Sequence, residues 1–147
     1  MEEDRHHAFH WSRYHPGLIV DLLPYGFVPV YVGNRTYYYD DGVYYVPAPA
    51  GYVVAPPPVG AVVPVLPAGA EKIVADGRVY YYAAGAFYVR HPDGYEVVRA
   101  PLGVTVNFLP PGAVPVMVRG KWYYQAAGGY FMPVMQDGAT VYVTVQP

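Results

Sequence analysis

The chain repeats itself at an interval of 43 residues without a gap, and this repeat constrains its fold more than any other feature. Each copy begins with a Leu-Pro pair and carries glycines and aromatic pairs at the same offsets. The matching positions include Leu23, Leu66 and Leu109; Gly26, Gly69 and Gly112; Tyr37, Tyr80 and Tyr123; Gly42, Gly85 and Gly128; and the aromatic pairs that begin at Tyr44, Phe87 and Tyr130. We therefore assign three repeats, at residues 23–65, 66–108 and 109–147, to a single domain that covers residues 18–147. A histidine-rich tail, residues 1–17, precedes this domain.

The residue types that fill the repeat indicate an all-β fold. The chain contains 18 tyrosines, 17 prolines and 16 glycines, and 54% of its residues are hydrophobic. Proline and glycine at this level break long helices, whereas tyrosine and valine favour strands. We expect no helix longer than about two turns after residue 20. Because a unit of this size buries little surface alone, we expect the three repeats of short antiparallel strands to share a core, as in a sandwich or barrel.

Short strands and tight turns can be assigned within each copy. In the first copy we expect strands at residues 28–32, 36–39, 43–46, 52–54 and 62–65, with the last one closing the unit. Gly33-Asn34 and the segment ending in Gly42 provide the turns, and both have equivalents in the other copies. The run from Ala139 to Gln146 alternates most regularly, and we expect it either to close the sheet or to pair with another chain.

The tyrosine pairs provide the first candidate site. Adjacent tyrosines on a strand point to opposite faces, so one face is core. The other face is either a stacking platform for a glycan or peptide, or a surface covered by a neighbouring repeat. We expect burial of Tyr38, Tyr81 and Tyr124, and exposure of the next position, which holds Tyr39, Tyr82 and Gln125. The candidate ligand-binding residues are Tyr39, Tyr45, Tyr82 and Tyr88.

A cluster of histidines near the start of the chain provides the second candidate site. Imidazole is a ligand for zinc, copper and nickel, and His6 and His10 would share one face of a helix. The alternative is a solvated tail that binds metal weakly and is dispensable for folding. The candidate metal ligands are His6, His7, His10 and His15.

Motifs for catalysis, cofactor binding or nucleic-acid binding are not found in the sequence. Ser12 is the only serine, cysteine is absent, and no nucleophile elbow, phosphate loop or zinc-protease motif occurs. We therefore expect neither an enzyme nor a cofactor. The net charge is −2 and the nine basic residues are scattered, which argues against nucleic acid as a partner. No apolar stretch approaches the roughly 20 residues of a membrane helix.

The motifs Leu-Pro-x-Gly, Tyr-Tyr-x-x-x-Gly-x-Tyr-Tyr, Gly-Tyr-x-Val and Pro-x-Gly resemble those of an uncharacterised family of small bacterial envelope proteins. These proteins carry such repeats behind a signal peptide or lipoprotein signal. The resemblance covers residue 23 to about residue 131. It implies a periplasmic or cell-surface location, with the signal removed from this chain, and it implies no activity.

These observations favour a non-catalytic structural or protein-interaction module of the bacterial envelope. Its expected partners are other envelope proteins or its own copies, with which it would self-assemble through β surfaces. The alternative is a module that binds glycan or peptidoglycan through exposed tyrosines. Self-assembly would favour the first function, and a monomer with a tyrosine-lined groove would favour the second.

Overall fold

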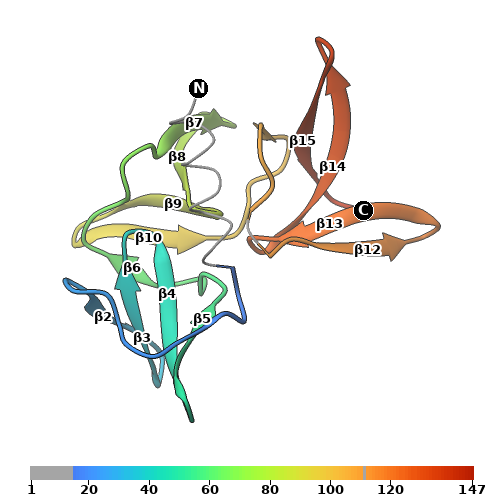
Figure 1. Cartoon of the computed structure of the whole chain (residues 1–147). Helices are drawn as coiled ribbons and strands as arrows, with labels where there is room; N and C mark the ends of the chain where they lie inside the picture. Colours follow the sequence, from blue (N-terminus) through green and yellow to red (C-terminus); the bar gives the residue numbers. More distant parts are fainter. Residues whose placement is uncertain (1–14, 111) are drawn as a thin grey trace.

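The computed structural model describes residues 15–110 and 112–147. All regular secondary structure within these ranges is β-strand. The strands form three separate antiparallel sheets of five strands each, which follow one another along the chain (Figure 1). The predicted all-β fold is confirmed. The histidine-rich segment before residue 15, for which either a tail or a short helix was considered, lies outside the described residues.

The three sheets have the same strand order. The first sheet contains β1 (Ile19–Val20), β2 (Val28–Val32), β3 (Arg35–Asp40), β4 (Val43–Ala48) and β5 (Gly51–Ala55). The second contains β6 (Val62–Val63), β7 (Glu71–Ala75), β8 (Arg78–Ala83), β9 (Ala86–His91) and β10 (Gly94–Val98). The third contains β11 (Thr105–Val106), β12 (Val114–Val118), β13 (Lys121–Ala126), β14 (Gly129–Gln136) and β15 (Ala139–Val145). In each sheet the four longer strands form a meander, and the two-residue strand that precedes them pairs with the last strand.

The short strand that opens each sheet begins the structural unit. Residues 62–65 were expected to close the first repeat, but Val62 and Val63 form β6 and pair with β10 of the second sheet. The free edge of β5 in the first sheet is already taken by β1, and Pro64 ends β6 because proline cannot donate to a ladder. We call residues 17–22, 60–65 and 103–108, which contain these short strands, the leading segments.

Tight turns with positive φ angles join the strands of each meander. Asp41 and Gly42 have φ angles of 47° and 91°, the pattern of a type I′ turn, whose twist matches that of the strands it joins. Gly33 has a φ of 60° in the first hairpin. Ala84 and Ala127 also adopt positive φ, at 46° and 53°, although this region is unfavourable for alanine. The turns expected from the sequence are therefore present.

Proline and lysine protect the outer edges of the sheets. Pro29 and Pro115 occupy equivalent positions in the edge strands β2 and β12. Lys72 occupies the same position in β7. A residue without an N–H group, or with a charged side chain, discourages another strand from pairing with an edge.

The β14–β15 hairpin is longer than its equivalents. Tyr52, Tyr95 and Tyr142 pair in the same way with the short strands β1, β6 and β11. Tyr52 and Tyr95 are 43 positions apart, whereas Tyr95 and Tyr142 are 47 apart, so the third hairpin has four additional residues. Strand β15 closes the third sheet by pairing with β11 and β14, and the hairpin projects away from the rest of the molecule (Figure 1).

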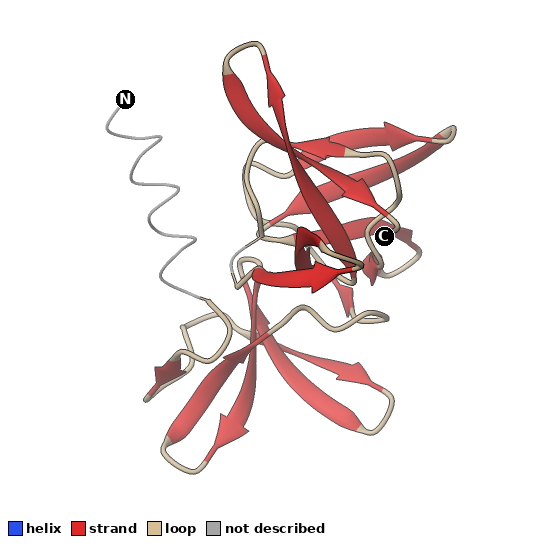
Figure 2. Ribbon diagram, turned by 90° about the vertical axis from the view of Figure 1, so that its right-hand side faces the viewer, coloured by secondary structure: helices blue, strands red, loops and turns tan. Residues whose placement is uncertain are grey.

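The two hairpins of each sheet diverge, because the strands that connect them pair over a short distance. In the first sheet β3 and β4 pair at three positions, whereas β2 and β3 pair at five. Figure 2 shows the hairpins splayed apart, and the next sheet packs on the face between them. Each sheet stays open, so the architecture is a series of packed sheets rather than a closed barrel.

Two hydrophobic clusters hold the sheets together, and each is shared between neighbours. The first combines residues of the first two sheets: Val30, Tyr37, Tyr39, Tyr44, Ala61, Val63, Ala83, Ala86, Tyr88 and Val97. The second combines residues of the second and third sheets: Tyr82, Phe87, Val104, Val106 and Phe131. The prediction that the repeats share a core is confirmed. The three sheets therefore do not have separate hydrophobic cores.

Candidate functional site

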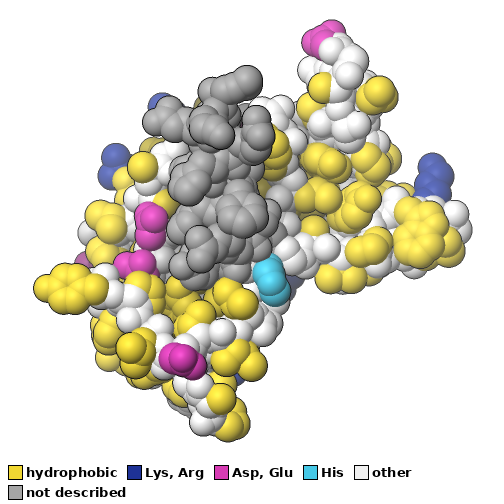
Figure 3. Space-filling view, in the orientation of Figure 1, with side chains coloured by type: hydrophobic (Ala, Val, Ile, Leu, Met, Phe, Trp, Pro, Cys, Tyr) yellow, Lys and Arg dark blue, Asp and Glu magenta, His cyan; other side chains and the backbone are white. Residues whose placement is uncertain are grey.

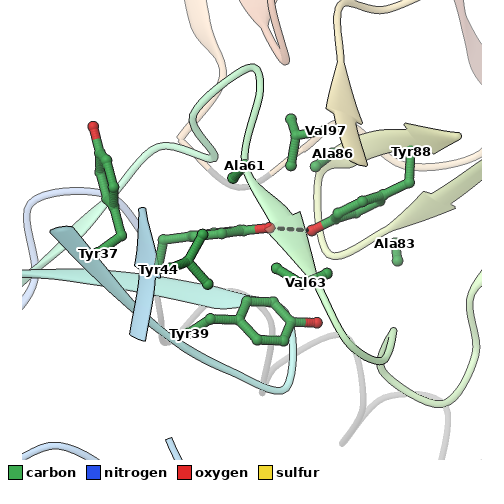
Figure 4. Packing of buried hydrophobic residues seen from close by; sticks show 10 residues of the cluster. Tyr37, Tyr39, Tyr44, Ala61, Val63, Ala83, Ala86, Tyr88 and Val97 are labelled. Carbon is green, nitrogen blue, oxygen red and sulfur yellow. Dashed lines mark hydrogen bonds between the residues drawn. The ribbon is translucent and has the colours of Figure 1, made fainter. Parts of the chain in front are cut away.

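Each junction between sheets joins one face of a sheet to the opposite face of the next. Tyr39 and Tyr44 are cross-strand neighbours on β3 and β4, and their side chains lie against residues of the second sheet (Figure 4). We call this side of a sheet its receiving face. The opposite side, which carries Tyr45 in the first sheet and Tyr88 in the second, is the front face, because successive strand residues point to opposite sides.

The first junction contains a hydrogen-bonded pair of tyrosines. The hydroxyl oxygens of Tyr44 and Tyr88 lie 2.6 Å apart, and the two side chains are 1% and 0% exposed (Figure 4). Tyr39 donates a second hydrogen bond, of 2.7 Å, to the carbonyl oxygen of Val65 in the leading segment of the second sheet. Because each of these hydroxyls has a partner, their burial does not leave a polar group unsatisfied.

Burial keeps these hydroxyls protonated. Loss of contact with water raises the pKa of Tyr39, Tyr44 and Tyr82, since a phenolate is poorly stabilised in an apolar environment. The pKa of Tyr88 is raised to about 12 by burial, although its hydrogen bond with Tyr44 acts in the opposite direction. The tyrosines of the junctions are therefore neutral phenols, which suit packing rather than acid–base chemistry near neutral pH.

The second junction resembles the first, except that phenylalanine replaces tyrosine in both of the opposing sheets. Phe87 and Phe131, the equivalents of Tyr44 and Tyr88, stack with ring centroids 6.5 Å apart and an interplanar angle of 22°. Tyr82, the equivalent of Tyr39, donates to the carbonyl oxygen of Phe108 at 3.2 Å. Replacement of both tyrosines by phenylalanine removes the two hydroxyls together, so neither is left without a partner.

The third sheet has a receiving face on which no further sheet packs within the described residues. Tyr130, the equivalent of Tyr44 and Phe87, is partly exposed, and Gln125 stands exposed at the position of Tyr39 and Tyr82. The Gln125 amide donates to the Tyr130 hydroxyl at 3.4 Å. In Figure 3 hydrophobic side chains gather between the two hairpins of this sheet, on the right of the molecule. We define the third receiving face as Val114, Val116, Tyr123, Gln125, Tyr130 and Met132.

The expectation that the candidate ligand-binding tyrosines form an exposed platform is wrong. Tyr39 and Tyr82 are 2% and 8% exposed, because the next sheet covers the receiving face that carries them. Tyr45 and Tyr88, on front faces, are 2% and 0% exposed. Among the described residues, this sequence position is exposed in the third copy, at Gln125, on whose face no further described sheet packs. The alternative that neighbouring repeats cover the tyrosines applies to Tyr39, Tyr82 and Tyr88.

Tyr38, Tyr81 and Tyr124 were expected to be buried, and the structure gives them equivalent positions but only partial burial. Each makes an edge-on contact with a tyrosine of the last strand of its sheet, with interplanar angles between 81° and 86°. The pairs are Tyr38–Tyr52, Tyr81–Tyr95 and Tyr124–Tyr142, with ring centroids 5.9, 5.5 and 6.2 Å apart. Their front-face positions lie beside the junctions rather than at the centre.

Of the four candidate metal ligands, His15 alone lies in the described part of the chain. It is exposed, and its Nδ1 lies 3.1 Å from the carbonyl oxygen of the adjacent Pro16. His6, His7 and His10 lie outside the described residues. Across residues 15–110 and 112–147, no three or more His, Cys, Asp or Glu side chains come together as a metal site.

The third receiving face was not identified from the sequence, although two signals for it are present. The first is the change from tyrosine at positions 39 and 82 to Gln125 in the third copy, on whose face no further sheet packs within the described residues. The second is that each internal junction pairs two residues of the same type, Tyr44 with Tyr88 and Phe87 with Phe131. Tyr130 is the equivalent residue that has no such partner in an internal junction. Both signals depend on knowing which faces meet.

Three sheets of one design, each packed on the next through aromatic side chains, define an all-β protein built as a linear series of similar units. Over residues 3–147 the chain matches the model of a family of unknown function, DUF6515, and it belongs to that family. The expected membership of an uncharacterised family is confirmed. No curated protein and no solved structure matches the chain. Within the described residues, no helix has the length and apolar character needed to cross a membrane.

Proposed function

We propose that the protein is a non-catalytic structural or interaction module of the bacterial envelope, which binds proteins through its β-sheet surfaces. The observation that carries this proposal is the uncovered third receiving face. Its tyrosines and Met132 are of the residue types enriched at the centre of protein interfaces. The equivalent faces of the other two sheets already bind a protein surface, that of the next sheet. A protein is therefore the class of partner best supported.

A periplasmic or cell-surface location is part of the same proposal. It is supported by the resemblance of the Tyr-Tyr and Leu-Pro-x-Gly motifs to those of envelope proteins. Fractionation of cells that carry an epitope tag at the end of the chromosomal gene tests it directly. We expect the protein in the periplasmic or membrane fraction, and recovery in the cytoplasmic fraction alone would contradict the location.

Site-specific photo-crosslinking tests the interaction itself. A photoreactive amino acid replaces Met132, on the third receiving face, or Met135, which is exposed on the opposite face of the same hairpin. We expect irradiation of intact cells to give a protein adduct of defined size from position 132 and none from position 135. If position 132 forms no adduct with any protein, the proposed function is wrong.

Binding of glycan or peptidoglycan is the competing proposal, and exposed aromatic side chains other than the four expected ones support it. Tyr25, Tyr31 and Trp122 are more than half exposed, and aromatic faces stack on sugars. Cosedimentation of the chain with purified peptidoglycan compares the two functions. Binding that is lost in Trp122→Ala but kept in Met132→Asp would favour the glycan function over the protein interaction.

A further inference from the structure

Every sheet carries a central aromatic residue on its front face and another on its receiving face. The front-face residues are Tyr45, Tyr88 and Phe131, and the receiving-face residues are Tyr44, Phe87 and Tyr130. Tyr45, Tyr88, Phe131, Tyr44 and Phe87 are buried, whereas Tyr130 is partly exposed. The front face of the first sheet is therefore covered at its centre, whereas the receiving face of the third sheet is not fully covered.

This asymmetry limits how a second copy of the chain can bind. A free front face on the first sheet would allow the internal junction to recur head to tail, and the copies would grow into a filament. Tyr45 and Val54, at the centre of that front face, are already buried within their own chain. Within residues 15–110 and 112–147, the surface of this kind that a second copy can still offer is its own third receiving face.

Building on the proposed function, we infer that the third receiving faces of two copies pack against each other about a two-fold axis and form a closed dimer. Such a contact would pack aromatic side chains of two sheets together, as the two internal junctions do, at the described receiving face that has no such contact. It would cover Tyr130 as the second sheet covers Tyr44 and the third covers Phe87.

The residues of this face suit a contact with a copy of themselves. Close to a two-fold axis a charged side chain meets its own like charge, and the six residues that define the third receiving face are uncharged. Lys121, which points to the same side of β13, pairs with Val118 at the turn end of the hairpin, four residues from Gln125. The Gln125 amide and the Tyr130 hydroxyl can each donate and accept a hydrogen bond. Each group can therefore bond to the same group of a second copy, as Tyr44 and Tyr88 bond within the chain.

Sedimentation velocity of the full chain tests the dimer, over concentrations from about 1 µM to about 1 mM, which span weak to moderate affinities. We expect a monomer–dimer equilibrium for the natural chain. Met132→Asp places two carboxylates in the contact and should weaken dimerisation by about tenfold or more. Met135→Asp, on the outer face of the same hairpin, is the matched control and should leave it unchanged. Circular dichroism verifies that both variants fold.

Cross-linking provides a second readout, because the natural chain contains no cysteine. Single variants Met132→Cys and Met135→Cys are treated with a short bis-maleimide reagent. We expect a covalent dimer from position 132 and none from position 135. Equal cross-linking from both positions would indicate random collision and would overturn the inferred contact.

Three further results would overturn the inference: a monomer at every concentration, dimers that Met132→Asp leaves intact, or oligomers that keep growing with concentration. A monomeric chain that still gives a protein adduct from position 132 in cells would overturn the dimer and leave the proposed function standing. Absence of both would reject both.

Discussion

At the residue scale, the tyrosine hydroxyls of the first junction depend on each other for a hydrogen-bond partner. Tyr44 and Tyr88 come from different sheets, and each satisfies the other's hydroxyl in a site that excludes water. A buried polar group without a partner costs more than its hydrogen bond contributes when formed. Phe87 and Phe131 show that the same site accepts two apolar rings.

Tyr44→Phe should lower the free energy of unfolding by about 1–3 kcal/mol, because it leaves the Tyr88 hydroxyl buried without its partner. The double variant Tyr44→Phe/Tyr88→Phe should lie within about 1 kcal/mol of the natural chain, since it reproduces the second junction. Urea unfolding of both single variants and the double variant measures the coupling. A double variant that loses the sum of the two single effects would contradict this account.

The exposure of individual tyrosines illustrates what the sequence leaves undetermined at this scale. Alternation along a strand predicts that Tyr38 and Tyr39 point to opposite faces, and they do. It does not say which face another sheet will cover, and the second sheet, which lies between the other two, is covered on both faces. Position 125, which holds Gln in place of Tyr, is exposed, and no further sheet packs on its face within the described residues.

At the element scale, the two-residue strands control how neighbouring sheets meet. Strand β6 pairs with β10, while its Val63 side chain belongs to the core shared with the first sheet. Gly94, at the start of β10, allows β6 to come close, because a Cβ atom there would overlap the carbonyl oxygen of Val63. The missing side chain of Gly94 thus allows β6 to pair at the edge of the second sheet and to place Val63 in the first junction.

Gly94→Ala should therefore lower the free energy of unfolding by about 3 kcal/mol, because β6 must move away from β10 and take Val63 out of the core. The control is Gly77→Ala, at a turn with φ of 74° and no atom within 4 Å of the added Cβ. That change carries only the backbone cost of about 1 kcal/mol. Equal losses in chemical unfolding of the two variants would show that β6 does not need the close approach.

A substitution in the turn between β12 and β13 should stabilise the protein. Arg119 adopts a φ of 52°, which is unfavourable for arginine, and Gly120 follows it. Arg119→Asn creates the Asn-Gly pair preferred in type I′ turns and should raise the free energy of unfolding by about 0.5–1 kcal/mol. Asp137→Asn, in the β14–β15 turn with the same φ of 52°, replaces a residue that tolerates this region and should have little effect. Similar gains in melting temperature for both variants would contradict the explanation.

The sequence analysis located the elements well and their grouping less well. The strand at residues 28–32 and the glycine-containing turns agree with the structure, because a 43-residue repeat aligns three independent examples of each signal. A repeat has no intrinsic starting point, so it did not show that Val62 belongs to the following sheet. Strands of two residues also fall below the length at which alternation can be recognised.

At the scale of the whole molecule, the buried phenols make stability depend on alkaline pH. The pKa of Tyr39, Tyr44, Tyr82 and Tyr88 is raised in the folded state above its unfolded value of about 10. Below that value both states keep these protons. Above it the unfolded state loses them while the folded state retains them, so folding becomes less favourable as the pH rises.

We therefore expect the free energy of unfolding to be constant up to about pH 9. Above about pH 10 it should fall by up to roughly 1.4 kcal/mol per pH unit for each buried phenol. Urea unfolding between about pH 8 and pH 12, with phenolate absorbance recorded in parallel, measures both quantities. The Tyr44→Phe/Tyr88→Phe variant should show a shallower decline, because it lacks two of these groups. An unchanged slope would mean that the pair ionises in the folded state.

The matched rings of the two junctions also bear on the order in which the units associate as the chain folds. Similar units in one chain can dock on the wrong neighbour, a common failure of repeat proteins. If the third sheet docked on the first, Tyr44 would face Phe131 and its hydroxyl would be buried alone, at a cost of about 1–3 kcal/mol. Tyrosine opposite tyrosine and phenylalanine opposite phenylalanine thus distinguish the correct neighbour from the skipped one. Units with the same strand order are thus distinguished at their junctions by the presence or absence of two hydroxyl groups.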